Sequence, residues 1–127
     1  MTVSRLAGRK ALGDQAEQLA ARLLEQRGLR ILERNWRRPE GEVDLVAEDD
    51  EVLVFVEVRS RTGEEHGHPL ETVNTRKQRR VVRAARRYLE ECAISWREFR
   101  FDVVGITFPE EGGDPIAMYI EDAFRVS

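Results

Sequence analysis

Residues 41–47 read GEVDLVA, and residues 54–59 read VFVEVR. The second segment belongs to an apolar run, residues 52–58, in which Glu57 is the one acid. A carboxylate in such a run is costly to bury unless another group pairs with it. Asp44, in the first segment, is the candidate partner. We therefore expect Asp44 and Glu57 to lie together around a metal ion.

The stretch between the two segments predicts a β-hairpin. Asp49, Asp50 and Glu51 separate two β-branched runs, residues 42–48 and 52–61, as turn residues do. Side chains alternate between faces along each strand. A loop with an even number of residues puts Asp44 and Glu57 on one face, either directly opposed or one pair apart, and an odd loop separates them unless a bulge intervenes. Arg59 shares the face of Glu57.

Composition describes one domain, residues 1–127, with 41% hydrophobic residues and no apolar run of the roughly 18 residues that a membrane span needs. Residues 1–10 lack the apolar region of a signal peptide, so we expect a flexible N-terminus, no membrane association and a cytoplasmic protein. Cys92 is the one cysteine, which excludes a disulfide framework or a cysteine metal cluster. We expect it to be a small buried hydrophobe.

Basic residues are concentrated between residues 76 and 87, although 21 basic and 24 acidic side chains give a net charge of −3. The apolar residues of this segment have helical spacing. One face of the helix then carries a stripe of arginines, with Lys77 at the boundary of the packing face, and guanidinium groups suit phosphate oxygens. The alternative is a solvated helix face. The predicted phosphate-binding residues are Arg76, Arg79, Arg80, Arg83, Arg86 and Arg87.

The remaining elements follow from periodicity and from glycine and proline positions. The expected order is helix, three strands, helix, strand, strand, which is an α/β (α+β) fold with a mixed sheet of four or five strands. Gly28 is expected to cap the first helix. The expected elements are a helix at 11–27, strands at 29–37, 42–48 and 52–61, a polar loop at 62–69, a helix from 70 or 75 to 92, and strands at 99–108 and 116–120 with a tail at 121–127.

Several motifs in this order resemble the YraN-like family of bacterial proteins (uncharacterised protein family 0102). The family is similar in fold to the restriction-endonuclease-like nucleases and Holliday-junction resolvases, whose core is helix, three strands, helix, strand. By that similarity Glu17, Asp44, Glu57 and Arg59 occupy the active site. The matching motifs are GDQAEQLA at 13–20, RNW at 34–36, GEVDLVA at 41–47, VFVEVRSR at 54–61, KQRR at 77–80, RFDVV at 100–104 and IEDAF at 120–124.

The resemblance implies metal-dependent phosphodiester hydrolysis. Asp44 and Glu57, with the carbonyl of Val58, are expected to bind Mg²⁺ or Mn²⁺, and Glu17 to bind the same or a second ion. Arg59 stands where the nucleases usually have lysine. Arginine stays protonated and cannot act as a base, but it can stabilise charge on the phosphate. Lys77 is then expected to lean toward the sheet and substitute for the missing lysine.

Each candidate residue also has a structural alternative. Glu17 can complete a capping box begun by Asp14, Asp44 can be an outward strand position, and Glu57 can pair with Arg59 or Arg61. Other polar and aromatic residues favour structural roles. Asp102 is expected to pair with an arginine, His66 and His68 to be surface residues, and Trp36 and Trp96 to lie in or at the core.

Two functions follow. The first is a structure-selective nuclease acting on DNA, with branched or junction DNA among its substrates, and the second is a nucleic-acid-binding accessory protein that keeps the nuclease fold without cutting. A protein-interaction module that uses the same hairpin is a third. Similarity to the resolvases also implies a homodimer.

Overall fold

The structure is a computed structural model that describes residues 5–63, 73–93 and 98–126. The expected positions of His66, His68 and Trp96 lie outside these residues. The elements are helix α1 (Arg5–Gln26), strands β1 (Arg30–Arg38), β2 (Gly41–Asp49) and β3 (Val52–Thr62), helix α2 (Thr75–Glu91), and strands β4 (Phe99–Phe108) and β5 (Ile116–Phe124).

The five strands form one sheet in the order β1-β2-β3-β4-β5. Strand β3 pairs with β4 in parallel, and the other neighbouring pairs are antiparallel. Helix α2 is the crossover that the parallel pair requires. The structure confirms the expected mixed sheet of an α+β fold.

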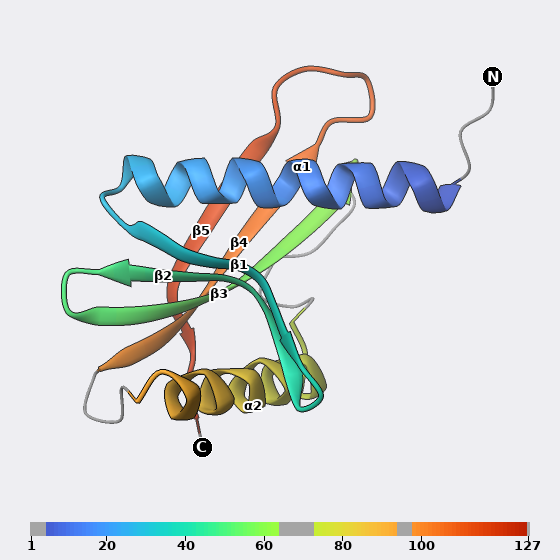
Figure 1. Cartoon of the computed structure of the whole chain (residues 1–127). Coiled ribbons are helices and arrows are strands. Elements are labelled where there is room, and N and C mark those ends of the chain that lie inside the picture. Colours follow the sequence, from blue (N-terminus) through green and yellow to red (C-terminus); the bar gives the residue numbers. More distant parts are fainter. Residues whose placement is uncertain (1–4, 64–72, 94–97, 127) are drawn as a thin grey trace.

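The two helices cover opposite faces of the sheet (Figure 1). Each face buries its own apolar cluster, so the sheet is apolar on both sides. On the side of α1 the buried residues include Ala16, Ala20, Leu24, Leu45, Val54, Val56, Val104 and Ile106. On the side of α2 they include Trp36, Val46, Phe55, Val81, Ala85, Tyr88, Phe101 and Val103. The burial of Trp36 confirms its expected place in the core.

The β2–β3 turn sets the register of the candidate site. Asp49 pairs with Val52, which leaves a loop of the two residues Asp50 and Glu51. Asp50 adopts a left-handed φ of 54°, which aspartate tolerates better than most residues. The even loop length is the case in which Asp44 and Glu57 share a face.

Element boundaries differ from the expected ones at both ends of the chain. Helix α1 begins at Arg5 rather than Ala11, so residues 5–10 are helical and not an irregular extension. It ends before Gly28, whose φ of 91° confirms the expected glycine cap. Strand β5 continues through residues 121–124, which were expected in the tail, and Phe124 pairs with Phe101 of β4 beyond an irregularity in the register.

The prediction that Cys92 is buried is wrong. Its side chain is exposed. Helix α2 ends at Glu91 and Cys92 is its C-cap, one turn past Tyr88, the last buried residue of the helix.

The start of β2 touches the backbone of α2 at Gly41. A Cβ atom built at this buried glycine lies 2.0 Å from the carbonyl oxygen of Arg80. We expect Gly41→Ala to lower the free energy of unfolding by about 1–3 kcal/mol, because a backbone atom must move. Urea denaturation measures the change.

Gly13→Ala is the matched control for this substitution. Nothing lies within 4 Å of a Cβ atom at Gly13, which is inside α1. The alanine is expected to raise stability by about 0.5–1 kcal/mol. Equal stability of Gly41→Ala and the unmodified protein would show that the hairpin and α2 do not need this close approach.

Candidate functional site

Asp44 and Glu57 face each other where two strands separate. The β2–β3 ladder ends at the pair Leu45–Val56, and the same register places Asp44 opposite Glu57 one residue further on. Beyond this point the β1–β2 hairpin bends away toward α2 (Figure 1). Glu57 and Phe55 are two residues apart in β3, so their side chains lie on the same face of the sheet. Phe55 belongs to the apolar cluster under α2, and the carboxylate pair therefore lies on the α2 side.

The two carboxyl groups are held in contact. The Oδ2 atom of Asp44 accepts a hydrogen bond of 2.7 Å from the backbone N–H of Val58. Each of the two carboxyl groups also shifts the pKa of the other, so Asp44 and Glu57 lie close together. The side chain of Glu57 is 13% exposed and that of Asp44 is half-buried. Asp44 is therefore not a simple outward strand position.

Burial and mutual repulsion favour a proton on this pair. Burial first, and then the negative charge of Asp44, raise the pKa of Glu57 to about 8. Burial also raises the pKa of Asp44, while the hydrogen bond from Val58 works in the opposite direction. In the absence of a cation the pair is thus expected to keep one proton at neutral pH.

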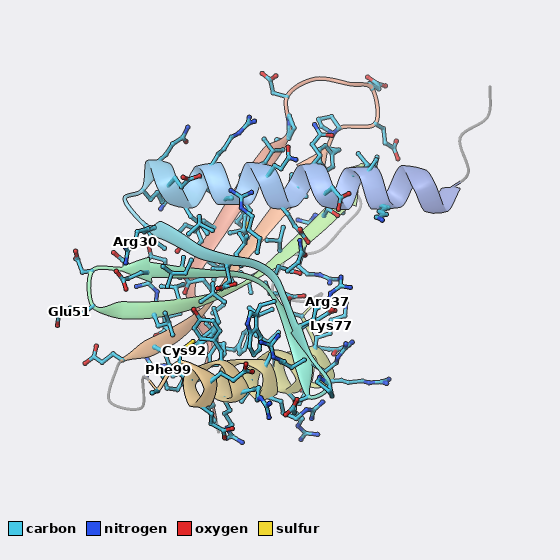
Figure 2. The ribbon with its side chains drawn as sticks, viewed as in Figure 1. Arg30, Arg37, Glu51, Lys77, Cys92 and Phe99 are labelled. Carbon is cyan, nitrogen blue, oxygen red and sulfur yellow. The ribbon has the colours of Figure 1, made fainter. Side chains whose placement is uncertain are left out.

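Two cationic side chains approach the pair from different elements. The Nη1 atom of Arg59 lies 3.7 Å from Oε1 of Glu57, so the expected ion pair forms. Lys77 lies at the start of α2 on the side that faces the sheet (Figure 2). Burial, and then the positive charge of Arg59, lower the pKa of Lys77, while Glu57 raises it. Lys77 is the one of the two cations that can release a proton.

Glu17 interacts electrostatically with Asp44 but does not form a three-residue metal-binding group with Asp44 and Glu57. It lies on α1, and its pKa is raised first by burial and also by the negative charge of Asp44. Yet no three His, Cys, Asp or Glu side chains in the described residues are grouped closely enough to hold one metal ion. The capping-box alternative is wrong, because α1 begins at Arg5 and Asp14 lies in its interior.

Sequence reasoning missed Asn35, which binds Glu17. The side-chain amide of Asn35 donates a hydrogen bond that lowers the pKa of Glu17. Asn35 has a left-handed φ of 51° in the middle of β1. The available signal was the asparagine in the RNW motif, since asparagine is enriched in this conformation. Both residues line an open pocket of about 580 Å³ with Lys10, Gly13, Asp14 and Arg37.

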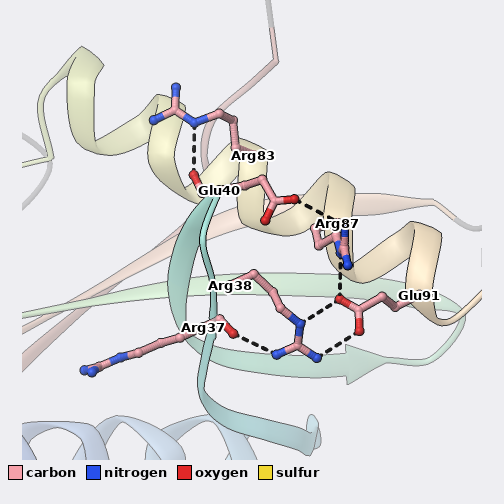
Figure 3. Close-up of polar contacts among 6 residues, drawn as sticks. All are labelled: Arg37, Arg38, Glu40, Arg83, Arg87 and Glu91. Atoms are coloured by element: carbon pink, nitrogen blue, oxygen red, sulfur yellow. Dashed lines mark hydrogen bonds and ion pairs between the residues drawn. The ribbon is translucent and has the colours of Figure 1, made fainter.

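The arginines of α2 divide between two surroundings. Those that face the β1–β2 hairpin meet its acids and its backbone (Figure 3). Arg80 lies 3.7 Å from Glu42, Arg87 lies 3.3 Å from Glu40, and the Nε atom of Arg83 donates to the carbonyl of Glu40 at 3.0 Å. The single stripe of available guanidinium groups expected from the helical periodicity is therefore partly neutralised.

Glu91 completes this contact between the hairpin and α2. It lies 2.8 Å from Arg38 of β1 and 3.0 Å from Arg87. Hydrogen bonds from these two arginines lower the pKa of Glu91 to about 2. Arg76, Arg79 and Arg86, in contrast, form no ion pair with any acid among residues 5–63, 73–93 and 98–126.

Asp102 has the structural role expected for it. It is fully buried and lies 3.1 Å from the Nε atom of Arg100. It also accepts hydrogen bonds from the hydroxyl of Tyr119 and the backbone N–H of Asp122. This carboxylate joins β4 to β5 and is not available as a metal ligand.

Fold and site together define a class: an α+β protein with a two-sided mixed sheet and a buried carboxylate pair where two strands separate. The chain belongs to the uncharacterised protein family UPF0102, whose family model matches residues 16–106. This confirms the family resemblance of the sequence motifs. None of the helices in the described residues has the length and apolar content of a membrane span.

The relatives cover nearly the whole chain. A UPF0102 protein of Anaeromyxobacter dehalogenans is 51% identical over 92% of this chain and 86% of its own length. A UPF0102 protein of Nitrosococcus oceani is 47% identical over 90% of this chain and 91% of its own. A UPF0102 protein of Rhodococcus opacus is 44% identical over 94% of this chain and 100% of its own length.

Proposed function

We propose that this protein binds DNA, including branched or junction DNA, and hydrolyses phosphodiester bonds at the site formed by Asp44 and Glu57. The observation that carries the proposal is the proximity of two partly buried carboxyl groups to each other and to two cations, Arg59 and Lys77. Two ionised carboxylates are costly to bury together unless a cation or a proton compensates their charge, and groups with shifted pKa values of this kind cluster at functional sites. A titratable cluster of this kind marks a functional site.

The donor groups at this site fit Mg²⁺ or Mn²⁺. Asp44 and Glu57 supply the oxygen ligands that these cations prefer, and a positive charge between them offsets the cost of burying both carboxylates and the repulsion that raises the pKa of Glu57. Glu17 interacts with Asp44 through its charge, and we propose it as a ligand of a second ion. When bound, the cation polarises a phosphoryl oxygen and lowers the pKa of water.

The protein's own groups have separable roles in this proposal. The N–H of Val58 holds Asp44 in a fixed orientation. Arg59 stabilises negative charge that develops on the phosphate, as a group that cannot lose its proton. Lys77, whose pKa is lowered, can take up and release a proton at Nζ near the scissile bond.

The proposal also includes the cell compartment and the assembly. We propose that the protein acts on DNA in the cytoplasm. The resemblance in fold between this family and the resolvases is the reason to propose a homodimer, in which two sites would act on two strands of a junction.

A second candidate function is nucleic-acid binding without cleavage. Two observations favour it. Arg59 occupies the position that usually carries lysine, and the described residues contain no group of three metal-ligating side chains.

One experiment separates the two functions. The purified protein is incubated with labelled single-stranded, duplex, flap and four-way-junction DNA, and with RNA, in Mg²⁺, in Mn²⁺ and in EDTA. We expect cleavage of DNA that requires the metal. Binding without cleavage in either metal would establish the second candidate instead, and the absence of both binding and cleavage would exclude the two together.

A further inference from the structure

A second basic surface lies on the side of α2 that faces the C-terminal end of β5. It is a groove of about 400 Å³. No acidic side chain of the described residues lines it. Its polar lining consists of Thr75, Gln78, Arg79, Arg83, Arg86 and Arg125.

The charges in this groove are less compensated than those on the hairpin side of α2. Arg79 and Arg86 pair with no described acid, and both are exposed. The Nε atom of Arg83 donates to a neutral backbone carbonyl. Arg125 contacts Asp122 at 2.5 Å, but its side chain is 81% exposed. Four guanidinium groups therefore face solvent with one acid beside them.

We propose that this groove binds the sugar-phosphate backbone of the nucleic acid that the carboxylate site acts on. The inference rests on the proposed function and adds a binding surface to it. The planar guanidinium fork matches two phosphate oxygens at once. Val82 and Val126, which also line the groove, supply apolar surface for a sugar or base.

The groove and the carboxylate site meet at the start of α2. The charges of Glu57 and Arg59 act on Lys77, whereas its neighbours Thr75 and Gln78 line the groove. A strand that lies along α2 can therefore contact both surfaces.

The length of the groove favours a chain of phosphates over a single anion. Arg79 and Arg86 are seven residues apart on α2, which corresponds to about 10 Å along the helix axis. One phosphate group does not span this distance. Arg125, which comes from the end of β5, widens the basic surface across a second element.

Two double substitutions on the same helix test the groove. Arg79→Ala/Arg86→Ala removes its guanidinium groups, and Arg80→Ala/Arg87→Ala, the control, removes two that face the hairpin acids. Both change the net charge equally. Binding of fluorescein-labelled duplex and junction DNA is measured by anisotropy over a range of salt concentrations in EDTA, and circular dichroism checks that each variant is folded.

We expect the groove variant to lose two phosphate contacts. The slope of log K against log salt then falls by about 1.8, and affinity at 0.1 M salt falls roughly 60-fold, at about 0.9 log units per contact. Arg125→Ala alone is expected to cost roughly eightfold on the same basis. The control pair is expected to lower the slope less than the groove pair does, because Arg80 and Arg87 already pair with Glu42, Glu40 and Glu91.

Four results would overturn the groove assignment. Equal losses of DNA affinity in the two double variants would show a general effect of charge. Unchanged DNA affinity of the groove variant would mean that the phosphate contacts lie elsewhere, while the proposed function stands. Inorganic phosphate that displaces DNA at concentrations too low to act as salt would indicate a single-anion site. If the unmodified protein binds no DNA, the proposed function fails together with the groove.

Discussion

Asp44→Asn is expected to slow single-turnover cleavage of labelled junction DNA about a thousandfold. Loss of one charged oxygen ligand removes several kcal/mol of transition-state stabilisation, and about 4 kcal/mol corresponds to a factor of 10³ in rate. The amide has the size of the carboxylate and can still accept the hydrogen bond from Val58. The local fold is therefore expected to survive the substitution.

Affinity is expected to respond differently from rate. Arginines position the DNA through its phosphates, independently of the carboxylates. In EDTA the loss of a negative charge near a phosphate is expected to strengthen binding slightly. Anisotropy of the same labelled junction measures this.

Glu42→Gln is the control for Asp44→Asn. Glu42 is also an acid of β2, but it pairs with Arg37 and Arg80 and not with Glu57. Its replacement is expected to leave the cleavage rate within a factor of about three of that of the unmodified protein, because a surface ion pair contributes little energy. Cleavage by Asp44→Asn at the rate of the unmodified protein would reveal a contaminating nuclease, and binding without cleavage would then be the better description.

The facing carboxylates could be predicted because their arrangement is local. The alternation of side chains along two strands and the length of one turn fix which residues share a face. Asp44 and Glu57 are 13 positions apart, and a two-residue loop settles their relation. The fold order followed similarly from apolar periodicity, including the helix that joins β3 to its parallel neighbour.

The surroundings of the α2 arginines could not be predicted in the same way. Helical periodicity gives the face that an arginine shares with its neighbours on the helix. It does not say that Glu40, 47 positions before Arg87, is brought against it by the bend of the β1–β2 hairpin. The position of Arg125 beside α2 depends likewise on the length and path of β5.

The start of α1 shows a different limit. Asp14 and Glu17 have the spacing of a capping box, which is a real start signal in other helices. Here the helix already begins at Arg5, with no acid in its first turn. A local motif was therefore outweighed by the continuation of the helix toward the N-terminus. Glu17 became available to Asn35 and the carboxylate pair as a result.

Stability of the metal-free protein is expected to fall as pH rises from about 4.5 to about 8. Folding raises the pKa of Glu57 from 4.5 to about 8, by burial and by the charges of Asp44 and Glu42 against that of Arg59. The native state therefore holds this proton more tightly than the unfolded state. The stabilising contribution of this proton to the free energy of unfolding is fully present below pH 4.5. It is lost as the pH rises from about 4.5 to about 8, at up to about 1.4 kcal/mol per pH unit.

Glu57→Gln removes this dependence, because the amide neither carries the charge nor titrates. In EDTA at pH 8 the variant is expected to melt roughly 5–10 °C above the unmodified protein. A shift of this size corresponds to a gain of about 2–3 kcal/mol in the free energy of unfolding for a domain of this length. Glu33→Gln, which removes an exposed acid from β1, controls for the change in net charge. Thermal melts followed by circular dichroism between pH 4.5 and 9 measure all three proteins.

Added Mg²⁺ should raise the melting temperature of the unmodified protein at pH 8 and leave that of Glu57→Gln nearly unchanged, since a ligand stabilises the state that binds it. If the unmodified protein and Glu57→Gln have parallel pH profiles, Glu57 is ionised in the folded protein at neutral pH, and the shared proton of the carboxylate pair is excluded.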